Sequence, residues 1–296
     1  MALSDWFRIP EKFSTLMIIP VQIVMNFTAM IPFALTWYVG MTNWQPQITP
    51  FFWEAQFVGI QNFLKIPGDD LFVASLARTL LIVAVCVPVE FLLGFGQAYV
   101  LSRNFRGRQA IRVIAIVPMM MVPIVTGYVF YLMFIPTGPV SSFINLITGR
   151  TEPILFFADP NLALMTIMLA DIWQWTPFIF LIFISSILAL PQDPINAAYV
   201  LGASRGYTFR RVMLPMLKTP IMIALILRSI ECFKVMELPW IMTQGGPGYS
   251  TFTIQMHLYE SAFKYLKYGF TNAQSLTIFI TMIIIGWYAS KPLRGG

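Results

Sequence analysis

The sequence predicts an all-α integral membrane protein with six transmembrane helices, and three observations support this class. Of the 296 residues, 57% are hydrophobic and 11% are charged, whereas soluble proteins contain about 25% charged residues. The mean hydropathy is +0.72. A membrane-spanning helix needs about 20 apolar residues, and suitable runs cover residues 15–38, 73–101, 111–135, 162–190, 220–242 and 272–289. The sequence lacks the alternating ten-residue strands of membrane barrels, so the spans are expected to be helices.

Lysine and arginine concentrate in one of the two alternating sets of loops, and this bias predicts the orientation. The richer set holds Arg8, Lys12, Arg103, Arg106, Arg108, Arg112, Arg205, Arg210, Arg211, Lys218, Lys291 and Arg294. The poorer set holds Lys65, Arg150, Lys264 and Lys267. Because cytoplasmic loops carry the excess of positive charge, we expect both termini and the loop at residues 191–217 to be cytoplasmic. The net charge of +6 then reflects topology, and no nucleic-acid partner is expected.

The spans divide the chain into four parts. Residues 1–14 form a cytoplasmic amphipathic segment, in which residues 4–13 are expected to be a helix on the inner surface. Residues 15–71 contain the first span and an outer loop, residues 72–290 form a core that includes the cytoplasmic loop at 191–217, and residues 291–296 form a cytoplasmic tail. No cleavable signal peptide is expected, since the first apolar run is long enough to remain in the membrane.

Several classes of chemistry are excluded by what the sequence lacks. Cys86 and Cys232 both lie in apolar runs, with no metal-ligand spacing, and His257 is the single histidine. These features predict neither a structural disulfide nor a metal site. No phosphate-binding P-loop motif and no nucleophile–base set is present. The chain is therefore expected to be non-catalytic and to hold no cofactor, and uphill transport would need energy from a partner.

The cytoplasmic loop at residues 191–217 is predicted to form a small helix–turn–helix on the inner face. Pro191 and Pro194 are expected to end the fourth span, because proline cannot continue a helix without losing a backbone hydrogen bond. Asn196 is a suitable N-cap for a first short helix. Gly202 permits a sharp turn, after which a second short helix is expected over residues 206–212. The alternative is an ordinary basic cytoplasmic loop.

This loop resembles the EAA coupling loop of ABC-importer permeases, with a pattern of roughly E-A-A-x-x-x-G-A followed by I-x-L-P. The matching residues are Ala197, Ala198, Gly202, Ala203, Phe209, Leu214 and Pro215. The family usually has Glu where this chain has Asn196, and often Asp where it has Leu201. The resemblance implies a surface that docks onto an ATPase, formed by Asn196, Ala197, Ala198, Gly202, Ala203, Ser204, Arg205, Phe209 and Pro215.

A second motif narrows the resemblance to carbohydrate-type permeases. Thr243-Gln-Gly-Gly-Pro247 followed by Ser250-Thr251 is similar to the family's T-x-G-G-P…S-T segment before the last span. Residues 233–237 are similar to the family's F-K-x-F-D. The likeness spans residues 72–290 and points to the maltose-type first permease subunit, with the type I ABC importer fold. It implies that Gly245, Gly246 and Pro247 help to dock an external binding protein, whereas interfacial anchoring is the alternative role for these outer loops.

Charged residues lie within the apolar runs, where each costs roughly 2.5–3.5 kcal/mol and usually pairs or faces a cavity. They are Glu90, Asp171, Arg228, Glu231, Lys234 and Glu237. One interpretation is pairing at three-residue spacing, Arg228 with Glu231 and Lys234 with Glu237. The other is a polar translocation path.

The resemblance places the sugar at Asp171, Gln174, Trp175, Arg228 and Cys232, with Glu231 nearby. Arg228 hints at an anionic or unusual saccharide, because relatives with neutral sugars have small polar residues there.

The resemblance therefore implies the transmembrane subunit of an ATP-driven, binding-protein-dependent importer of a sugar, oligosaccharide or polyol, working by alternating access. The implied partners are a second homologous permease, two ATPase subunits that bind ATP and magnesium, a solute-binding protein, the carbohydrate and membrane lipid. The implied location is the bacterial or archaeal cytoplasmic membrane, with several passes. Two alternatives remain: an ion-coupled secondary transporter that uses Glu90, Asp171 and Glu231, and an integral-membrane enzyme.

Overall fold

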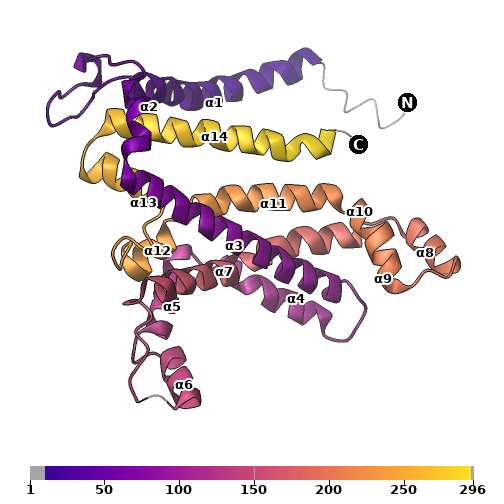
Figure 1. Cartoon of the computed structure of the whole chain (residues 1–296). Coiled ribbons are helices and arrows are strands. Elements are labelled where there is room, and N and C mark those ends of the chain that lie inside the picture. Colours follow the sequence, from indigo (N-terminus) through magenta and orange to yellow (C-terminus); the bar gives the residue numbers. More distant parts are fainter. Residues whose placement is uncertain (1–10, 150, 295–296) are drawn as a thin grey trace. The chain divides into compact units, whose positions relative to one another are not determined.

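The structure is a computed structural model that describes residues 11–149 and 151–294, and this part of the chain is helical throughout (Figure 1). Its only β-type pairing is an isolated bridge between Thr42 and Phe57. The α-helices are α1 (Glu11–Gly40), α2 (Gln61–Lys65), α3 (Asp70–Leu101), α4 (Arg108–Ile116), α5 (Pro123–Phe134), α6 (Pro139–Thr148), α7 (Pro160–Leu188), α8 (Gln192–Val200), α9 (Arg205–Thr208), α10 (Leu214–Met216), α11 (Lys218–Phe233), α12 (Glu237–Thr243), α13 (Ile254–Tyr259) and α14 (Tyr268–Arg294). The predicted all-α class is confirmed.

Short segments of other helical types connect these elements. Three are 3-10 helices, namely η2 (Phe52–Glu54), η3 (Ile66–Gly68) and η4 (Val117–Met120). Two are π-helices, namely η5 (Phe209–Met213) and η6 (Glu260–Lys264). The expected amphipathic helix at residues 4–13 lies largely outside the described residues, since α1 is described from Glu11.

Five helices are long and apolar enough to cross a membrane, which agrees with a multi-span protein. They are Met17–Gly40, Asp70–Leu101, Pro123–Thr148, Pro160–Leu188 and Tyr268–Tyr288. A sixth span results if the bent pair Arg205–Met216 and Lys218–Phe233, with 65° between its parts, is counted as one.

Two of the expected spans are broken and are not continuous helices. The run at 111–135 is divided into α4, η4 and α5, with Met121 and Val122 extended between η4 and α5. Pro123 begins α5 and has no N–H with which to continue the preceding turn. In the run at 220–242, helix α11 ends at Phe233, and the next helix, α12, begins at Glu237. Hydropathy averaged over a whole run does not reveal these breaks, because each run remains apolar on average.

The chain contains two compact units, and the first comprises residues 1–68 and 260–280. In it, the Asn62 side chain donates hydrogen bonds to the carbonyls of Gly40, at 2.9 Å, and Thr42, at 2.8 Å. Phe33 packs edge-on against Phe279, with the ring centroids 5.5 Å apart. These contacts hold α2 and α14 to the end of α1, whose apolar side chains over residues 17–35 stay exposed.

The second unit comprises residues 69–259 and 281–296 and contains the polar features described below. Asp69 and Asp159 cap α3 and α7, because their carboxylates accept backbone N–H groups of the first turn. α3 and α7 lie side by side (Figure 1). Their approach is close at Gly94, where an added Cβ would lie 2.8 Å from the Cβ of Ile179. This pair of helices forms the frame on which α11 packs.

Candidate functional site

A buried ion cluster joins three helices in the second unit. Arg228 on α11 donates to Glu90 on α3 through two hydrogen bonds, Nε to Oε2 at 2.5 Å and Nη2 to Oε1 at 2.8 Å. Its Nη2 also donates to Oδ2 of Asp171 on α7. All three side chains are at most 2% exposed. The bidentate geometry is the strong form of an arginine–carboxylate pair.

The expected pairing along one helix face was wrong. Arg228 pairs across helices with Glu90 and Asp171, whereas Lys234 pairs with Glu231 at 2.8 Å. The three-residue spacing of Lys234 and Glu237 does not apply, because α11 ends at Phe233, before both residues, and α12 begins only at Glu237. Pairing between distant spans leaves no periodic signal in the sequence.

Two further side chains surround the cluster. The ring of Trp175 lies 5.1 Å from the guanidinium carbon of Arg228, within the range of a cation–π interaction. Sγ of Cys232 donates to Asp171 Oδ2 at 3.7 Å. Cys86 and Cys232 are free thiols, and ligand atoms of both and of Asp171 lie within 4.8 Å of one another. A metal ion bound there would meet the positive charge of Arg228, so the donor set fits a packed thiol pair better than a cation site.

A polar cavity of about 400 Å³ lies beside this cluster. It is lined by Pro123, Asp171, Gln174, Trp175, Glu231, Lys234, Val235, Met236, Glu237, Leu238 and Gln255. The structure thus brings together four of the predicted path residues in its lining: Asp171, Gln174, Trp175 and Glu231. Arg228 and Cys232 are buried behind Asp171 and are not part of the lining.

Both broken spans open onto this cavity, and side chains satisfy the backbone groups that the breaks release. Gln174 Nε2 donates to the Met121 carbonyl at 2.9 Å. The Thr253 hydroxyl donates to the Val235 carbonyl at 2.9 Å. Irregular backbone at membrane depth is tolerated only where protein buries it or where it lines a cavity. Interrupted helices around a polar cavity are typical of solute sites in transporters.

Thr253, Gln255 and the Met121 carbonyl were not among the candidate residues derived from the sequence. Pro118 and Pro123 were visible signs of a break in the third run. No comparable sign marks Gln255, which lines the cavity, or Thr253, which binds the Val235 carbonyl; the tertiary fold places both.

The loop at residues 191–217 forms α8, α9, η5 and α10, and two details differ from the prediction. α8 begins at Gln192 after Pro191, so Asn196 lies inside the helix and is not its N-cap, and Pro194 lies in the first turn. Proline suits this position, because first-turn N–H groups have no intrahelical partner. The second helix begins at Arg205, and the Ser204 hydroxyl caps it by accepting the Tyr207 N–H at 3.3 Å.

The turn between these helices presents apolar side chains at its tip. Gly202 has a φ of +83°, a left-handed conformation that glycine adopts without strain. Val200 and Leu201, next to it, are 88% and 86% exposed. Phe209 packs against Tyr99 of α3, with the ring centroids 4.9 Å apart, and fastens the loop to the helix frame. The loop is therefore anchored at one side and exposed at its tip.

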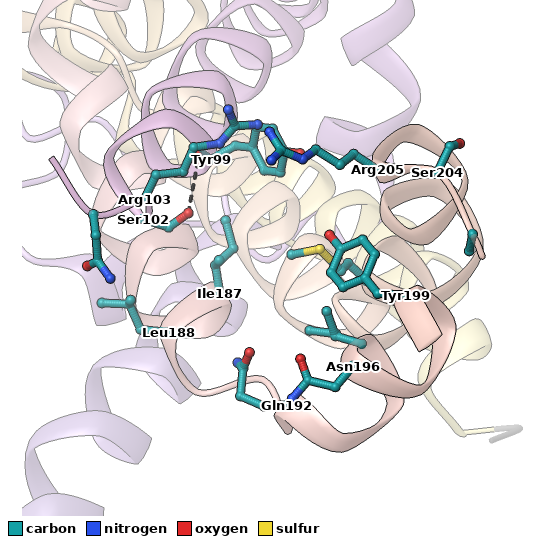
Figure 2. A pocket seen from close by; sticks show the side chains of 14 residues that line it. Tyr99, Ser102, Arg103, Ile187, Leu188, Gln192, Asn196, Tyr199, Ser204 and Arg205 are labelled. Carbon is teal, nitrogen blue, oxygen red and sulfur yellow. Dashed lines mark hydrogen bonds between the residues drawn. The ribbon is translucent and has the colours of Figure 1, made fainter. Parts of the chain in front are cut away.

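A groove of about 830 Å³ lies between this loop and the ends of α3 and α7. Asn196, Ala203, Ser204 and Arg205 of the predicted docking surface are among its 14 lining residues. Figure 2 shows Arg103 and Arg205 on the same rim as Tyr99, over which the Arg103 guanidinium carbon lies at 5.0 Å. The described residues around this groove include two guanidinium groups and no carboxylate.

The Gly-Gly-Pro motif at residues 245–247 forms a tight turn. Gly245 is buried with a φ of +86°, and an added Cβ would lie 2.6 Å from the Phe252 side chain. The Thr251 hydroxyl donates to the Gly246 carbonyl at 2.9 Å. Tyr249 at this turn is 50% exposed. The turn thus fixes the backbone, while its neighbours supply the surface.

A bundle of membrane-crossing helices, with a polar cavity at two helix breaks, defines a membrane transport protein. The family of binding-protein-dependent transport system inner membrane components matches residues 90–290, and the chain belongs to this family. The chain is accordingly a multi-pass inner-membrane protein.

Two relatives have names that describe their substrates. The chain is 30% identical over 275 residues to the trehalose/maltose transport system permease protein MalF of Thermococcus litoralis, covering 92% of this chain and 90% of the relative. It is 31% identical over 239 residues to the trehalose transport system permease protein SugA of Mycobacterium tuberculosis, covering 80% and 75%. These relatives are permease subunits, so the resemblance inferred from the motifs is confirmed.

Solved structures show the same fold. A chain in the crystal structure of a bacterial alginate ABC transporter, in complex with an alginate pentasaccharide-bound periplasmic protein, superposes with a TM-score of 0.81. The match covers 98% of each chain at 16% identity. Fold and family together favour a binding-protein-dependent importer over the ion-coupled secondary transporter.

Proposed function

We propose that this chain is the transmembrane subunit of an ATP-driven ABC importer that moves a carbohydrate into the cytoplasm. The observation that carries the proposal is the polar cavity at the two helix breaks, bounded by α11, the helix that leads directly from the loop at residues 191–217. The names of relatives that transport trehalose and maltose support a saccharide as the solute.

In this proposal, the exposed tip of that loop couples the chain to the ATPase. Val200 and Leu201 expose apolar side chains in an otherwise polar segment, and exposed apolar groups on a rigid turn suit docking to a partner. The partner in this proposal is an ATPase, one of two, which binds ATP and magnesium. A second homologous permease completes the membrane part. In this proposal the tip and both termini are cytoplasmic, and the excess of lysine and arginine in these loops supports that orientation.

The transport role falls to the cavity. Trp175 offers a ring face for a sugar ring, and Gln174 and Asp171 offer hydrogen-bonding groups. Arg228 has a structural role in this proposal, because its guanidinium is already held by two carboxylates. A solute-binding protein delivers the saccharide from outside, near the turn formed by Gly245, Gly246 and Pro247. Closure of the ATPases moves the docked loops, and the helices alternate in access around the cavity.

The test is ATPase activity in proteoliposomes. The chain is co-purified with the permease and ATPase encoded beside it, and saccharide-loaded binding proteins are added outside. The proposal predicts that one loaded binding protein stimulates ATP hydrolysis. Ion-dependent solute uptake by this chain alone, with no associated ATPase, would contradict it.

A further inference from the structure

The cavity beside the ion cluster carries an excess of negative charge. Three carboxylates line it, those of Asp171, Glu231 and Glu237, together with a single ammonium group, that of Lys234. Lys234 is already paired with Glu231 at 2.8 Å. The net charge presented to a solute is therefore negative.

The adjacent arginine does not reverse this charge. Arg228 is 1% exposed, and its guanidinium donates to both Glu90 oxygens and to Asp171. One positive charge thus faces two buried carboxylates. A solute anion in the cavity would have to compete with Glu90 and Asp171 for the guanidinium, which lies behind the lining.

An unpaired hydrogen-bond acceptor in the cavity calls for a donor group on the ligand. Gln174 lines the cavity and is 2% exposed, and its Oε1 has no hydrogen-bond partner in the described part of the chain. Its Nε2 is fixed by donation to the Met121 carbonyl, which settles the orientation of the amide. A buried acceptor without a partner costs free energy, and a ligand hydroxyl or ammonium group would satisfy it.

We propose that this cavity admits uncharged or positively charged saccharides and excludes anionic ones, with Glu231, Glu237 and Asp171 setting the selectivity. The inference rests on the proposed function, since it gives the substrate class of the same cavity. It also replaces the hint of an anionic saccharide that Arg228 gave in the sequence. The likeness to an alginate transporter at 16% identity concerns the fold alone.

The charge selectivity can be measured without knowing the substrate. Gln255 lines the cavity and is partly exposed, so Gln255→Cys places a thiol there, with Met236→Cys as a second position. The variants are assembled with their partner subunits in proteoliposomes. The thiol is treated with a cationic trimethylammonium and an anionic sulfonate methanethiosulfonate reagent. Cys86 and Cys232 are fully buried, so the chain without the added cysteine gives the background rate.

The reaction rate of each reagent with the protein thiol is divided by the rate of the same reagent with free cysteine. We expect the cationic reagent to be favoured by about tenfold or more, because charged clefts raise the local concentration of counter-ions by that order. Adding Glu231→Gln and Glu237→Gln should bring the ratio of the cationic to the anionic reaction rate towards one. The inference would be overturned if the two reagents reacted at equal rates or if the anionic reagent reacted faster. An unchanged rate ratio in the glutamine variants, or no reaction at either position, would overturn it as well. ATPase stimulation of the same vesicles tests the proposed function separately.

Discussion

The guanidinium of Arg228 on α11 is held by the carboxylate of Glu90 on α3, which lies 138 residues earlier in the chain. The two groups meet in the interior of a membrane protein, where an unpaired charge is expensive. Their pairing fixes α11 against α3 and places Asp171 between the cluster and the cavity. The same contact therefore stabilises the bundle and sets the chemistry of the transport path.

Breaking this pair from one side should be strongly destabilising. Arg228→Met leaves the buried carboxylates of Glu90 and Asp171 without their cation, and the loss of a buried charge partner costs about 3–5 kcal/mol. The purified variants are heated and then run on a size-exclusion column, and the measured quantity is the temperature at which half of the monodisperse peak is lost. Lys234→Met is the matched control, since it breaks the exposed Glu231 pair, which contributes about 0–1 kcal/mol. Equal losses in both variants would contradict the structural role of Arg228.

Two glycines of α3 should respond oppositely to alanine. At Gly94 an added Cβ would lie 2.8 Å from Ile179, whereas at Gly96 nothing lies within 4 Å. Gly94→Ala should destabilise the protein by about 1–3 kcal/mol through overpacking. Gly96→Ala should be neutral or stabilising by up to about 1 kcal/mol, since alanine favours helix. Thermal unfolding of both variants checks this, and equal stability of the two would refute the close packing of α3 on α7.

Two tryptophans on α7 should separate transport from stability. Trp175 lines the cavity, whereas Trp173 packs against Phe130 at 5.5 Å between ring centroids. Trp175→Ala should raise the half-saturation concentration for uptake roughly 5–30-fold, corresponding to about 1–2 kcal/mol of lost ring contact. Trp173→Ala should instead lower the unfolding temperature. Saccharide uptake and thermal unfolding are measured on both variants, and the reverse pattern would remove Trp175 from the path.

The exposed leucine at the loop tip should control association with the ATPase. Leu201 is 86% exposed, so Leu201→Asp should leave the isolated chain as stable as before. Burial of a leucine contributes about 1.5–3 kcal/mol, so affinity for the ATPase should fall about 10–100-fold. Leu64→Asp is the control, because Leu64 is 71% exposed on α2 in the other unit. Co-purified ATPase is quantified, and equal yields with Leu201→Asp and the unmodified chain would exclude the tip as the contact.

Much of the fold could be predicted from the sequence, because long apolar runs such as 162–190 leave only one stable arrangement of the backbone in lipid. Hydropathy alone could not locate the helix breaks, although Pro118 and Pro123 flank the first break and Lys234 and Glu237 flank the second. The structure reveals them through the partners of their carbonyls, Gln174 and Thr253.

The candidate site was predicted in part. Asp171, Gln174 and Trp175 came from the resemblance, and the structure brings them to one cavity. The role of Arg228 could not be predicted, because its partners lie on two other helices. For the loop, the motif gave the positions, but the exposure of Val200 and Leu201 depends on the turn at Gly202.

ATP-driven saccharide uptake by the complete importer tests the central claim most directly. Proteoliposomes contain this chain with its partner permease and ATPase, the loaded binding protein is outside, and ATP is inside. We predict that accumulation requires ATP and persists with Leu64→Asp. With Leu201→Asp it should fall at least tenfold, which corresponds to a loss of about 1.4 kcal/mol or more of binding free energy for the ATPase. Accumulation that proceeds without ATP, or that is unaffected by Leu201→Asp, would contradict the account.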